Sequence, residues 1–240
     1  MLAVKRGMVM KVAVFHGSPR KGNTYQATKF FCDVLSACGD VQFTEFFLPA
    51  AVPKFCTGCQ LCFSHANDKC PHAEYIAPVL EAILAADALI FATPHHGVSA
   101  MSSGMKNMLD HLDFLTFVVA PRKELFSKKA FVITTGTGSV AAIKPIEKGL
   151  RNWGVNRVYT MGLRMFIDKW DSLAPTKQAR FEKKLQRAAR KFYRARKGVP
   201  YISTVLMFYM SKMIMKKYVG QGAYPYEHWR ENGYFTNRPF

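Results

Sequence analysis

Five short apolar stretches alternate with segments of helical periodicity along most of the chain. The stretches that predict β-strands are residues 11–16, 41–48, 88–92, 130–134 and 157–163. The segments with apolar residues at helical spacing are residues 24–38, 73–85, 100–115, 140–153 and 176–197. Strands that are joined through helices lie parallel in one sheet, with the helices covering both of its faces. The alternation therefore predicts an α/β fold with a doubly wound, five-stranded parallel sheet.

Loops rich in small and polar residues follow three of the predicted strands. These loops are residues 17–24, 93–99 and 135–139, and they contain glycine, serine, threonine, proline and histidine. In a parallel α/β sheet, ligands bind at the carboxyl ends of the strands, where such loops converge. The sequence therefore predicts one ligand site that is built from these three loops.

The first of these loops has the composition of an anion-binding turn. It reads Gly17-Ser-Pro-Arg-Lys-Gly-Asn-Thr24 and joins the first predicted strand to the first predicted helix. Backbone N–H groups and the positive end of the helix dipole favour a phosphate there, and Arg20 adds a charge. The glycine spacing approaches that of nucleoside-triphosphate loops, but Asn23 stands where those loops need a lysine. We therefore expect the loop to hold a phosphate rather than transfer one, with an ordinary strand–helix turn as the alternative.

A cluster of cysteines marks the loop that is predicted over residues 49–72. The four thiols of this segment belong to Cys56, Cys59, Cys62 and Cys70. Four thiolates suit a [4Fe–4S] cluster or a tetrahedral zinc ion, and free thiols are the third alternative. His65 and His72 can replace a ligand, although exposed loop histidines are the favoured interpretation for both.

The cysteine spacing and the N-terminal residues both indicate in which cellular compartment the protein is found. Clustered cysteines differ from the disulfide framework of a small secreted domain. Residues 1–9 lack the apolar region and the cleavage site of a secretory signal, and we interpret them as a short lead. We therefore expect a cytoplasmic protein, with one domain over residues 10–197 and a C-terminal extension over residues 198–240.

Positive charge is concentrated toward the C-terminus. The chain has 34 Lys and Arg residues against 16 Asp and Glu residues, a net charge of +18. Residues 151–240 hold 19 of the basic residues and 5 of the acidic ones. The basic helix 176–197 is interpreted as a solvated face, with acidic lipid or nucleic acid as alternative partners. The amphipathic and aromatic extension is expected to pack on a partner subunit or over the site, with peripheral membrane contact as the alternative.

Four motifs, taken in their order along the chain, resemble one protein family. They are Gly17-Ser-Pro-Arg-Lys-Gly-Asn-Thr24, Cys56-Thr-Gly-Cys-Gln-Leu-Cys62, Ala86-Asp-Ala-Leu-Ile-Phe-Ala-Thr-Pro94 and Met105-Lys-Asn-Met-Leu-Asp110. Together they resemble the NAD(P)H-dependent FMN reductase and iron–sulfur flavoprotein family over about residues 10–165. The resemblance implies a flavodoxin-like fold with strand order 2-1-3-4-5, and FMN with its phosphate on the first loop. It also implies that loops 93–99 and 135–139 flank the isoalloxazine ring, and that a homodimer or homotetramer completes the site.

The predicted cofactor contacts come from the three strand-end loops. They are Ser18, Arg20, Gly22, Asn23, Thr24, Pro94, His95, His96, Gly97, Thr135, Gly136, Thr137 and Gly138. In many members of the family a tyrosine beside the flavin follows the threonine–proline pair, whereas this chain has His95 and His96. A histidine can stack on the ring or hydrogen-bond to it, and a positive charge there would raise the flavin potential.

The favoured function is that of an FMN-dependent NAD(P)H oxidoreductase. FMN carries the hydride chemistry in such enzymes and NAD(P)H is the co-substrate, so no catalytic side chain is required. The predicted acceptor is a quinone, a flavin, another small molecule or a redox protein. One alternative is an iron–sulfur flavoprotein that carries electrons through a [4Fe–4S] cluster on the four clustered cysteines. The other is a non-enzymatic binder of membranes or nucleic acid through the basic C-terminal region, and nucleic acid is the less favoured partner.

Overall fold

The computed structural model describes residues 9–97, 100–166, 169–196 and 198–240. The lead that is predicted over residues 1–9 lies outside the described residues, apart from Val9. Residues 98–99 of the predicted site loop and residue 197 of the predicted basic helix also lie outside them.

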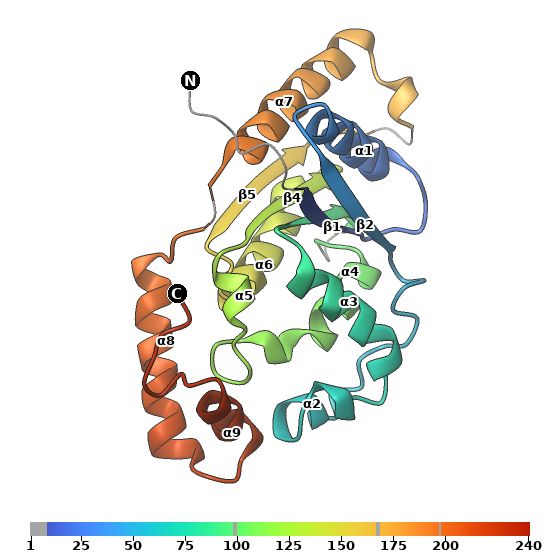
Figure 1. The fold of residues 1–240 in the computed structure, drawn as a ribbon. Coiled ribbons are helices and arrows are strands. Elements are labelled where there is room, and N and C mark those ends of the chain that lie inside the picture. Colours follow the sequence, from blue (N-terminus) through green and yellow to red (C-terminus); the bar gives the residue numbers. More distant parts are fainter. Residues whose placement is uncertain (1–8, 98–99, 167–168, 197) are drawn as a thin grey trace.

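The described residues contain a five-stranded sheet in which all neighbouring strands are parallel. Its strands are β1 (Met10–His16), β2 (Val41–Phe47), β3 (Ala88–Pro94), β4 (Lys129–Thr135) and β5 (Arg157–Leu163). They lie in the order β2-β1-β3-β4-β5, which confirms the predicted flavodoxin-like topology (Figure 1). Each of the five predicted strands is present, and β3 continues to Pro94, into the predicted loop.

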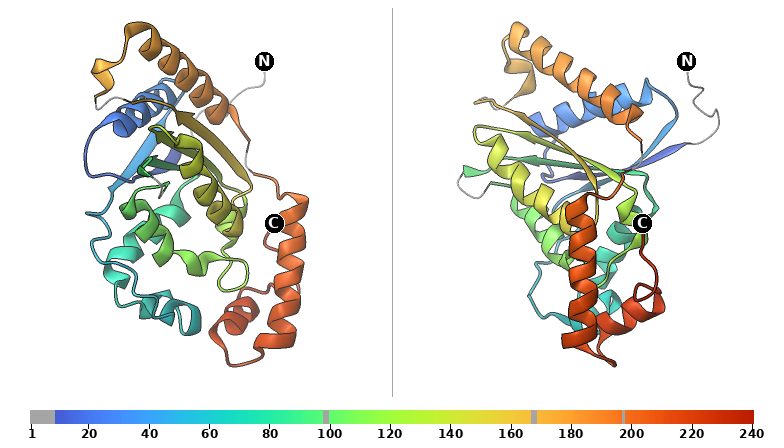
Figure 2. Two further views of the ribbon diagram at one scale, coloured as in Figure 1. Left: turned by 180° about the vertical axis from the view of Figure 1, so that it is seen from behind. Right: turned by 90° about the vertical axis from the view of Figure 1, so that its left-hand side faces the viewer.

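Helices cover both faces of the sheet (Figures 1 and 2). One face carries α1 (Asn23–Ser36) and α7 (Pro175–Arg194), and the other carries α3 (Ala73–Ala85), α4 (Ser103–His111) and α6 (Ser139–Asn152). Side chains of a strand alternate between faces. Val12 and Val14 of β1 therefore pack with α1 and α7, whereas Ala13 and Phe15 pack with the helices of the opposite face. This double burial explains why the central strands are continuously apolar.

The fourth helix is shorter than the helix predicted over residues 100–115. The Ser102 hydroxyl accepts a hydrogen bond from the Met105 N–H at 3.4 Å, and this cap sets where α4 begins. After the last residue of α4, a separate 3₁₀ turn follows at Asp113–Leu115. The loop predicted over residues 49–72 contains two short helical turns, α2 (Leu61–Ser64) and a 3₁₀ turn at Asn67–Lys69.

A buried lysine on β4 holds the C-terminal end of α7. The Lys129 ammonium donates to the carbonyls of Phe192, Tyr193 and Ala195 at 2.7, 3.1 and 3.2 Å. Carbonyls at the end of a helix lack helical partners, so the lysine supplies the donors that they need. Burial lowers the pKa of Lys129 to about 8. The core of the α/β unit thus includes α7, and the domain boundary near residue 197 stays a prediction.

The C-terminal extension packs against its own chain. It contains α8 (Ile202–Ile214), a π-helical turn at Met215–Val219 and α9 (Tyr224–Glu231). The rings of Phe208 and Trp229 stack at 5.0 Å and share a buried cluster with Phe117 and Phe126. The extension therefore lies beside α5 (Lys123–Phe126), and α9 contacts α2 (Figure 1). No described residue of the extension lines the cavity at the carboxyl ends of the strands of its own chain.

The outer face of α8 is apolar and exposed. Ile202, Leu206, Tyr209, Met210 and Met213 lie at helical spacing along it and are between 48% and 81% exposed. Contact of this face with a partner subunit or with a lipid surface stays a prediction from the sequence. In the described part of the chain, no helix is both long enough and apolar enough to cross a bilayer.

Replacement of Phe31 by alanine is expected to lower the free energy of unfolding by about 3–5 kcal/mol. The Phe31 ring is fully buried on α1, and its centroid lies 4.4 Å from that of Phe131 and 6.0 Å from that of Phe192. Urea denaturation followed by circular dichroism measures the change. Val140→Ala is the control, because that side chain is 63% exposed and its loss should cost less than about 0.5 kcal/mol. Equal stabilities of the two variants would contradict this description of the core.

Candidate functional site

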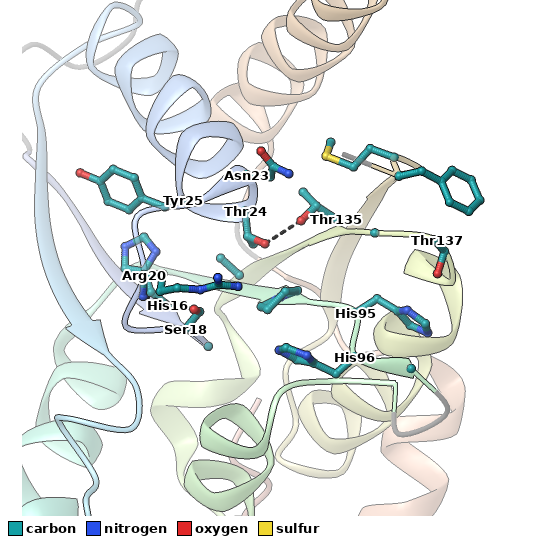
Figure 3. A pocket seen from close by; sticks show the side chains of 18 residues that line it. His16, Ser18, Arg20, Asn23, Thr24, Tyr25, His95, His96, Thr135 and Thr137 are labelled. Carbon is teal, nitrogen blue, oxygen red and sulfur yellow. Dashed lines mark hydrogen bonds between the residues drawn. The ribbon is translucent and has the colours of Figure 1, made fainter. Parts of the chain in front are cut away.

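A cavity of about 490 Å³ opens at the carboxyl ends of β1, β3 and β4. The loops that follow these strands supply most of its walls, and the segment after β5 completes them (Figure 3). The predicted residues that line this cavity are Ser18, Arg20, Gly22, Asn23, Thr24, Pro94, His95, His96, Gly97, Thr135, Gly136 and Thr137. The structure therefore brings the predicted cofactor contacts together around one cavity, with the exception of Gly138.

The loop after β1 presents backbone donors to this cavity. Gly22 is the N-cap of α1 and makes no side-chain capping hydrogen bond. The first N–H groups of the helix therefore point out of its end without helical acceptors. The loop also lies tightly against β3, because the Gly17 N–H donates to the Ala92 carbonyl at 2.7 Å. A Cβ atom on Gly17 would lie 2.6 Å from the Ser102 hydroxyl, so this close approach requires glycine.

A buried hydrogen bond joins two of the loops across the cavity. The hydroxyls of Thr24 and Thr135 lie 2.6 Å apart, and both residues are buried (Figure 3). Thr24 belongs to the first turn of α1 and Thr135 ends β4. The Thr28 hydroxyl donates to the Thr24 carbonyl at 2.8 Å. The hydrogen bond between the two threonines therefore fixes the distance between the start of α1 and the loop after β4.

Gly138 lies behind the cavity wall and positions His95. Its N–H donates to His95 Nδ1 at 3.3 Å, and the His95 N–H donates to the Thr135 carbonyl at 2.8 Å. The first of these bonds requires Nδ1 to be without a proton, so the neutral ring carries its proton on Nε2. A Cβ atom on Gly138 would lie 2.3 Å from His95 Nε2. Gly138 is therefore a positioning residue, and it does not line the cavity itself.

Six lining residues are not among the predicted contacts: His16, Gly17, Tyr25, Ala92, Met165 and Phe166. His16 is 3% exposed, and its Nε2 donates to the Glu45 carboxylate at 2.7 Å. Burial lowers the pKa of His16, and Glu45 opposes this shift in part. A polar residue at the last position of an apolar strand was the available signal for His16. The segment that holds Met165 and Phe166 carries no glycine-rich or serine-rich pattern, so the sequence gave no signal that these two residues belong to the site.

A second cavity, of about 320 Å³, is formed around the cysteine loop. All four predicted metal ligands line it: Cys56, Cys59, Cys62 and Cys70. The first two are exposed and the other two are half-buried. Burial is the main reason why the pKa of the Cys62 thiol is raised to about 11, and the neighbouring Cys70 adds to it. A bound metal cation would reverse this preference for the protonated thiol.

Two histidines lie at the same cavity. His72 Nδ1 lies 3.0 Å from His111 Nε2, and ligand atoms of Cys70 and both histidines lie within 4.8 Å of one another. His111 Nδ1 donates to the Asn107 carbonyl at 2.9 Å. His111 is not among the predicted ligands, because a position on the predicted helix 100–115 gave no sign that it reaches the cysteine loop. His65, the other predicted substitute for a thiol, does not line this cavity and lies 2.8 Å from the Ser64 hydroxyl.

The fourth helix holds the cysteine loop in place through a single asparagine. The Asn107 side-chain amide donates to the carbonyls of Val52 and Lys54 at 3.1 and 2.9 Å. Its side-chain oxygen accepts from the Cys56 N–H at 3.0 Å. Asn107 thus supplies hydrogen bonds to backbone groups of this segment that have no partner in a helix or a strand.

Comparisons with known proteins agree with this architecture. Residues 10–170 match the sequence model of a protein family described as NADPH-dependent FMN reductase. Among solved structures, an NAD(P)H:quinone oxidoreductase from Methanothermobacter marburgensis is similar, with a TM-score of 0.59 and 17% identity over 78% of this chain and 99% of that chain. An oxidoreductase from Corynebacterium diphtheriae has a TM-score of 0.55 and 18% identity over 77% of this chain and 95% of that one. An NADH:FMN oxidoreductase in its apo form has a TM-score of 0.51 and 18% identity over 81% of this chain and 93% of that chain.

No curated protein matches the sequence. At these identities, the likeness to solved structures shows the fold alone. The family match extends from β1 to beyond β5 and includes every residue that lines the first cavity. It ends before α7, so α7, α8 and α9 lie outside it.

Proposed function

Because the chain belongs to the NADPH-dependent FMN reductase family, we propose that it is an FMN-dependent oxidoreductase that takes hydride from NAD(P)H and reduces a small acceptor. A quinone or a flavin is the favoured acceptor, and a redox protein is the alternative. The observation that carries this proposal is the convergence of three strand-end loops on one cavity within the matched residues.

The residues around the first cavity fit FMN. A volume of about 490 Å³ falls within the range of about 300–1,000 Å³ that small-molecule sites occupy. The uncapped N-terminus of α1 and the Arg20 guanidinium supply donors and positive charge for a phosphate. Pro94, His95 and the residues from Thr135 to Thr137 would then contact the isoalloxazine ring.

FMN, when bound, supplies the hydride chemistry, so the side chains need only bind and orient the reactants. Three features of the chain serve this purpose. The hydrogen bond between Thr24 and Thr135 keeps the phosphate-binding turn at a fixed distance from the loop after β4. Gly138 holds the His95 ring in position, because the Gly138 N–H donates to His95 Nδ1. His16 donates to Glu45 and is largely neutral at pH 7, because burial lowers its pKa.

The oligomer and the compartment are part of this proposal. The exposed apolar face of α8 supports contact with a second subunit in a homodimer or homotetramer. All six cysteines are free, which supports a reducing, cytoplasmic setting.

Protein purified without oxygen should contain FMN, or bind it when FMN is added, and its flavin absorption should bleach on addition of NADPH or NADH. The bleaching follows from hydride transfer to the bound flavin. An anaerobic absorption spectrum, recorded before and after addition of each dinucleotide, measures it. A protein that stays colourless after incubation with FMN would overturn the proposal.

Gly138→Ala should weaken FMN binding about tenfold, because the added Cβ displaces the His95 ring from its position at the cavity. Fluorescence titration of the apoprotein with FMN measures the dissociation constant. Gly149→Ala is the matched control, since a Cβ atom at this position in α6 would meet no atom within 4 Å. Unchanged FMN affinity in a folded Gly138→Ala variant would exclude His95 as a flavin contact.

A second candidate function, an iron–sulfur electron carrier, is favoured by the four thiols that line the second cavity. Thiolates are the usual ligands of such clusters, so this donor set fits a [4Fe–4S] cluster, and also zinc. Metal and acid-labile sulfide should then be present in anaerobically purified protein and fall sharply in Cys59→Ser. Cys38→Ser, a change outside this cavity, should retain them. Metal-free protein in which NADPH still reduces the flavin would exclude the cluster and leave the first proposal standing.

A further inference from the structure

A third cavity, of about 580 Å³, lies between the end of β5 and the N-terminal half of α7. It adjoins the first cavity, because Phe166 lines both. Its charged lining residues are all basic: Arg164, Lys177, Arg180 and Lys184. Among the residues that the structure describes, no acidic side chain lines it. A strongly cationic cavity thus lies directly beside the proposed flavin site.

The helical repeat explains how three of these cations come together. Lys177, Arg180 and Lys184 are spaced three and four residues apart, so they lie on one face of α7. Phe181, between them in sequence, is 5% exposed and packs into the core. The buried phenylalanine therefore fixes the orientation of α7 and holds the cationic face toward the end of β5.

The four cations of this cavity lack acidic partners within the described part of the chain. Among the described residues, none of them forms an ion pair with a carboxylate. Like charges that share one cavity repel each other, and a bound anion would relieve this repulsion. Arginine guanidinium groups bind phosphate through paired hydrogen bonds, and lysine adds a compact charge. The cavity therefore has the chemistry of a phosphate site.

An exposed aromatic ring lies at the boundary of the two cavities. Phe166 is 72% exposed, which is unusual for so large an apolar side chain. The Arg164 guanidinium carbon lies 5.8 Å from its ring centroid. Stacking on a purine base would remove this ring from water, and the same aromatic–base contact is common in nucleotide sites.

We propose that this cavity binds the adenosine half of NADPH, with the cationic residues of α7 on the 2′-phosphate and Phe166 against the adenine ring. The inference rests on the proposed function, because the nicotinamide half must reach the flavin cavity that Phe166 also lines. It gives the chain a preference for the phosphorylated dinucleotide. The residues responsible lie on α7, beyond residues 10–170 that match the family.

Calorimetry with 2′,5′-ADP and 5′-AMP tests this site without any turnover. The protein as purified should bind 2′,5′-ADP at least tenfold more tightly than 5′-AMP. Arg180→Ala and Lys184→Ala should each weaken 2′,5′-ADP binding about tenfold and leave 5′-AMP binding unchanged. Arg190→Ala is the matched control, because it removes the same charge from the same helix but lines a different cavity. The affinity of this variant for 2′,5′-ADP should stay within about twofold of that of the unaltered protein at physiological ionic strength.

Steady-state kinetics supply an independent readout. The ratio of kcat/KM for NADPH to that for NADH should fall about tenfold in Arg180→Ala and stay constant in Arg190→Ala. Equal weakening of both dinucleotides would overturn the assignment to the 2′-phosphate. If Arg180→Ala and Arg190→Ala lose the preference for NADPH equally, the preference comes from the overall positive charge of the helix, and the proposal of a defined phosphate site is wrong. If 2′,5′-ADP binding follows the expected pattern but neither dinucleotide reduces the flavin, the phosphate site stands and the proposed function fails.

Discussion

Parallel pairing of β1, β3 and β4 determines where every loop of the first cavity begins. The register places His16 beside Ala92 and Pro94 beside Thr135, so β3 and β4 end at one level and β1 ends two residues before it. The chain that leaves each strand must then turn at the same edge of the sheet. Two contacts hold these turns close together: Gly17 against β3 and Thr24 against Thr135. The site is thus a direct result of backbone hydrogen bonding in the sheet, and the side chains refine it.

Most of the fold could be predicted from the sequence because each central strand is buried on both faces and therefore reads as an unbroken apolar run. The three strand-end loops could be predicted because their turns need glycine, proline and small polar residues. Other features depend on contacts between distant segments. Nothing local in the sequence indicates that Gly138 packs behind His95, or that the segment after β5 reaches the first cavity with Phe166. The apolar pattern of the extension likewise shows that one face must be buried, but not that Phe117 and Phe126 bury it.

The fourth helix joins the two cavities of the matched region. At its N-terminus, the Ser102 hydroxyl lies 3.1 Å from the Thr93 hydroxyl and lies against Gly17 of the loop after β1. In its last turns, Asn107 anchors the cysteine loop and His111 reaches the second cavity. A helix of nine residues spans about 13 Å. The loop after β1 and the cysteine loop are therefore both attached to one short rigid element, and a shift of α4 would displace both.

The two faces of α7 are subject to different demands. Its inner face, with Phe181, Leu185 and Phe192, is part of the core and cannot change without loss of stability. Its outer face carries exposed basic residues that take part in no described ion pair. Substitutions on this outer face can accumulate during evolution with little effect on folding. If coenzyme preference resides there, it can drift or reverse between descendants of this protein while the flavin-binding half stays the same.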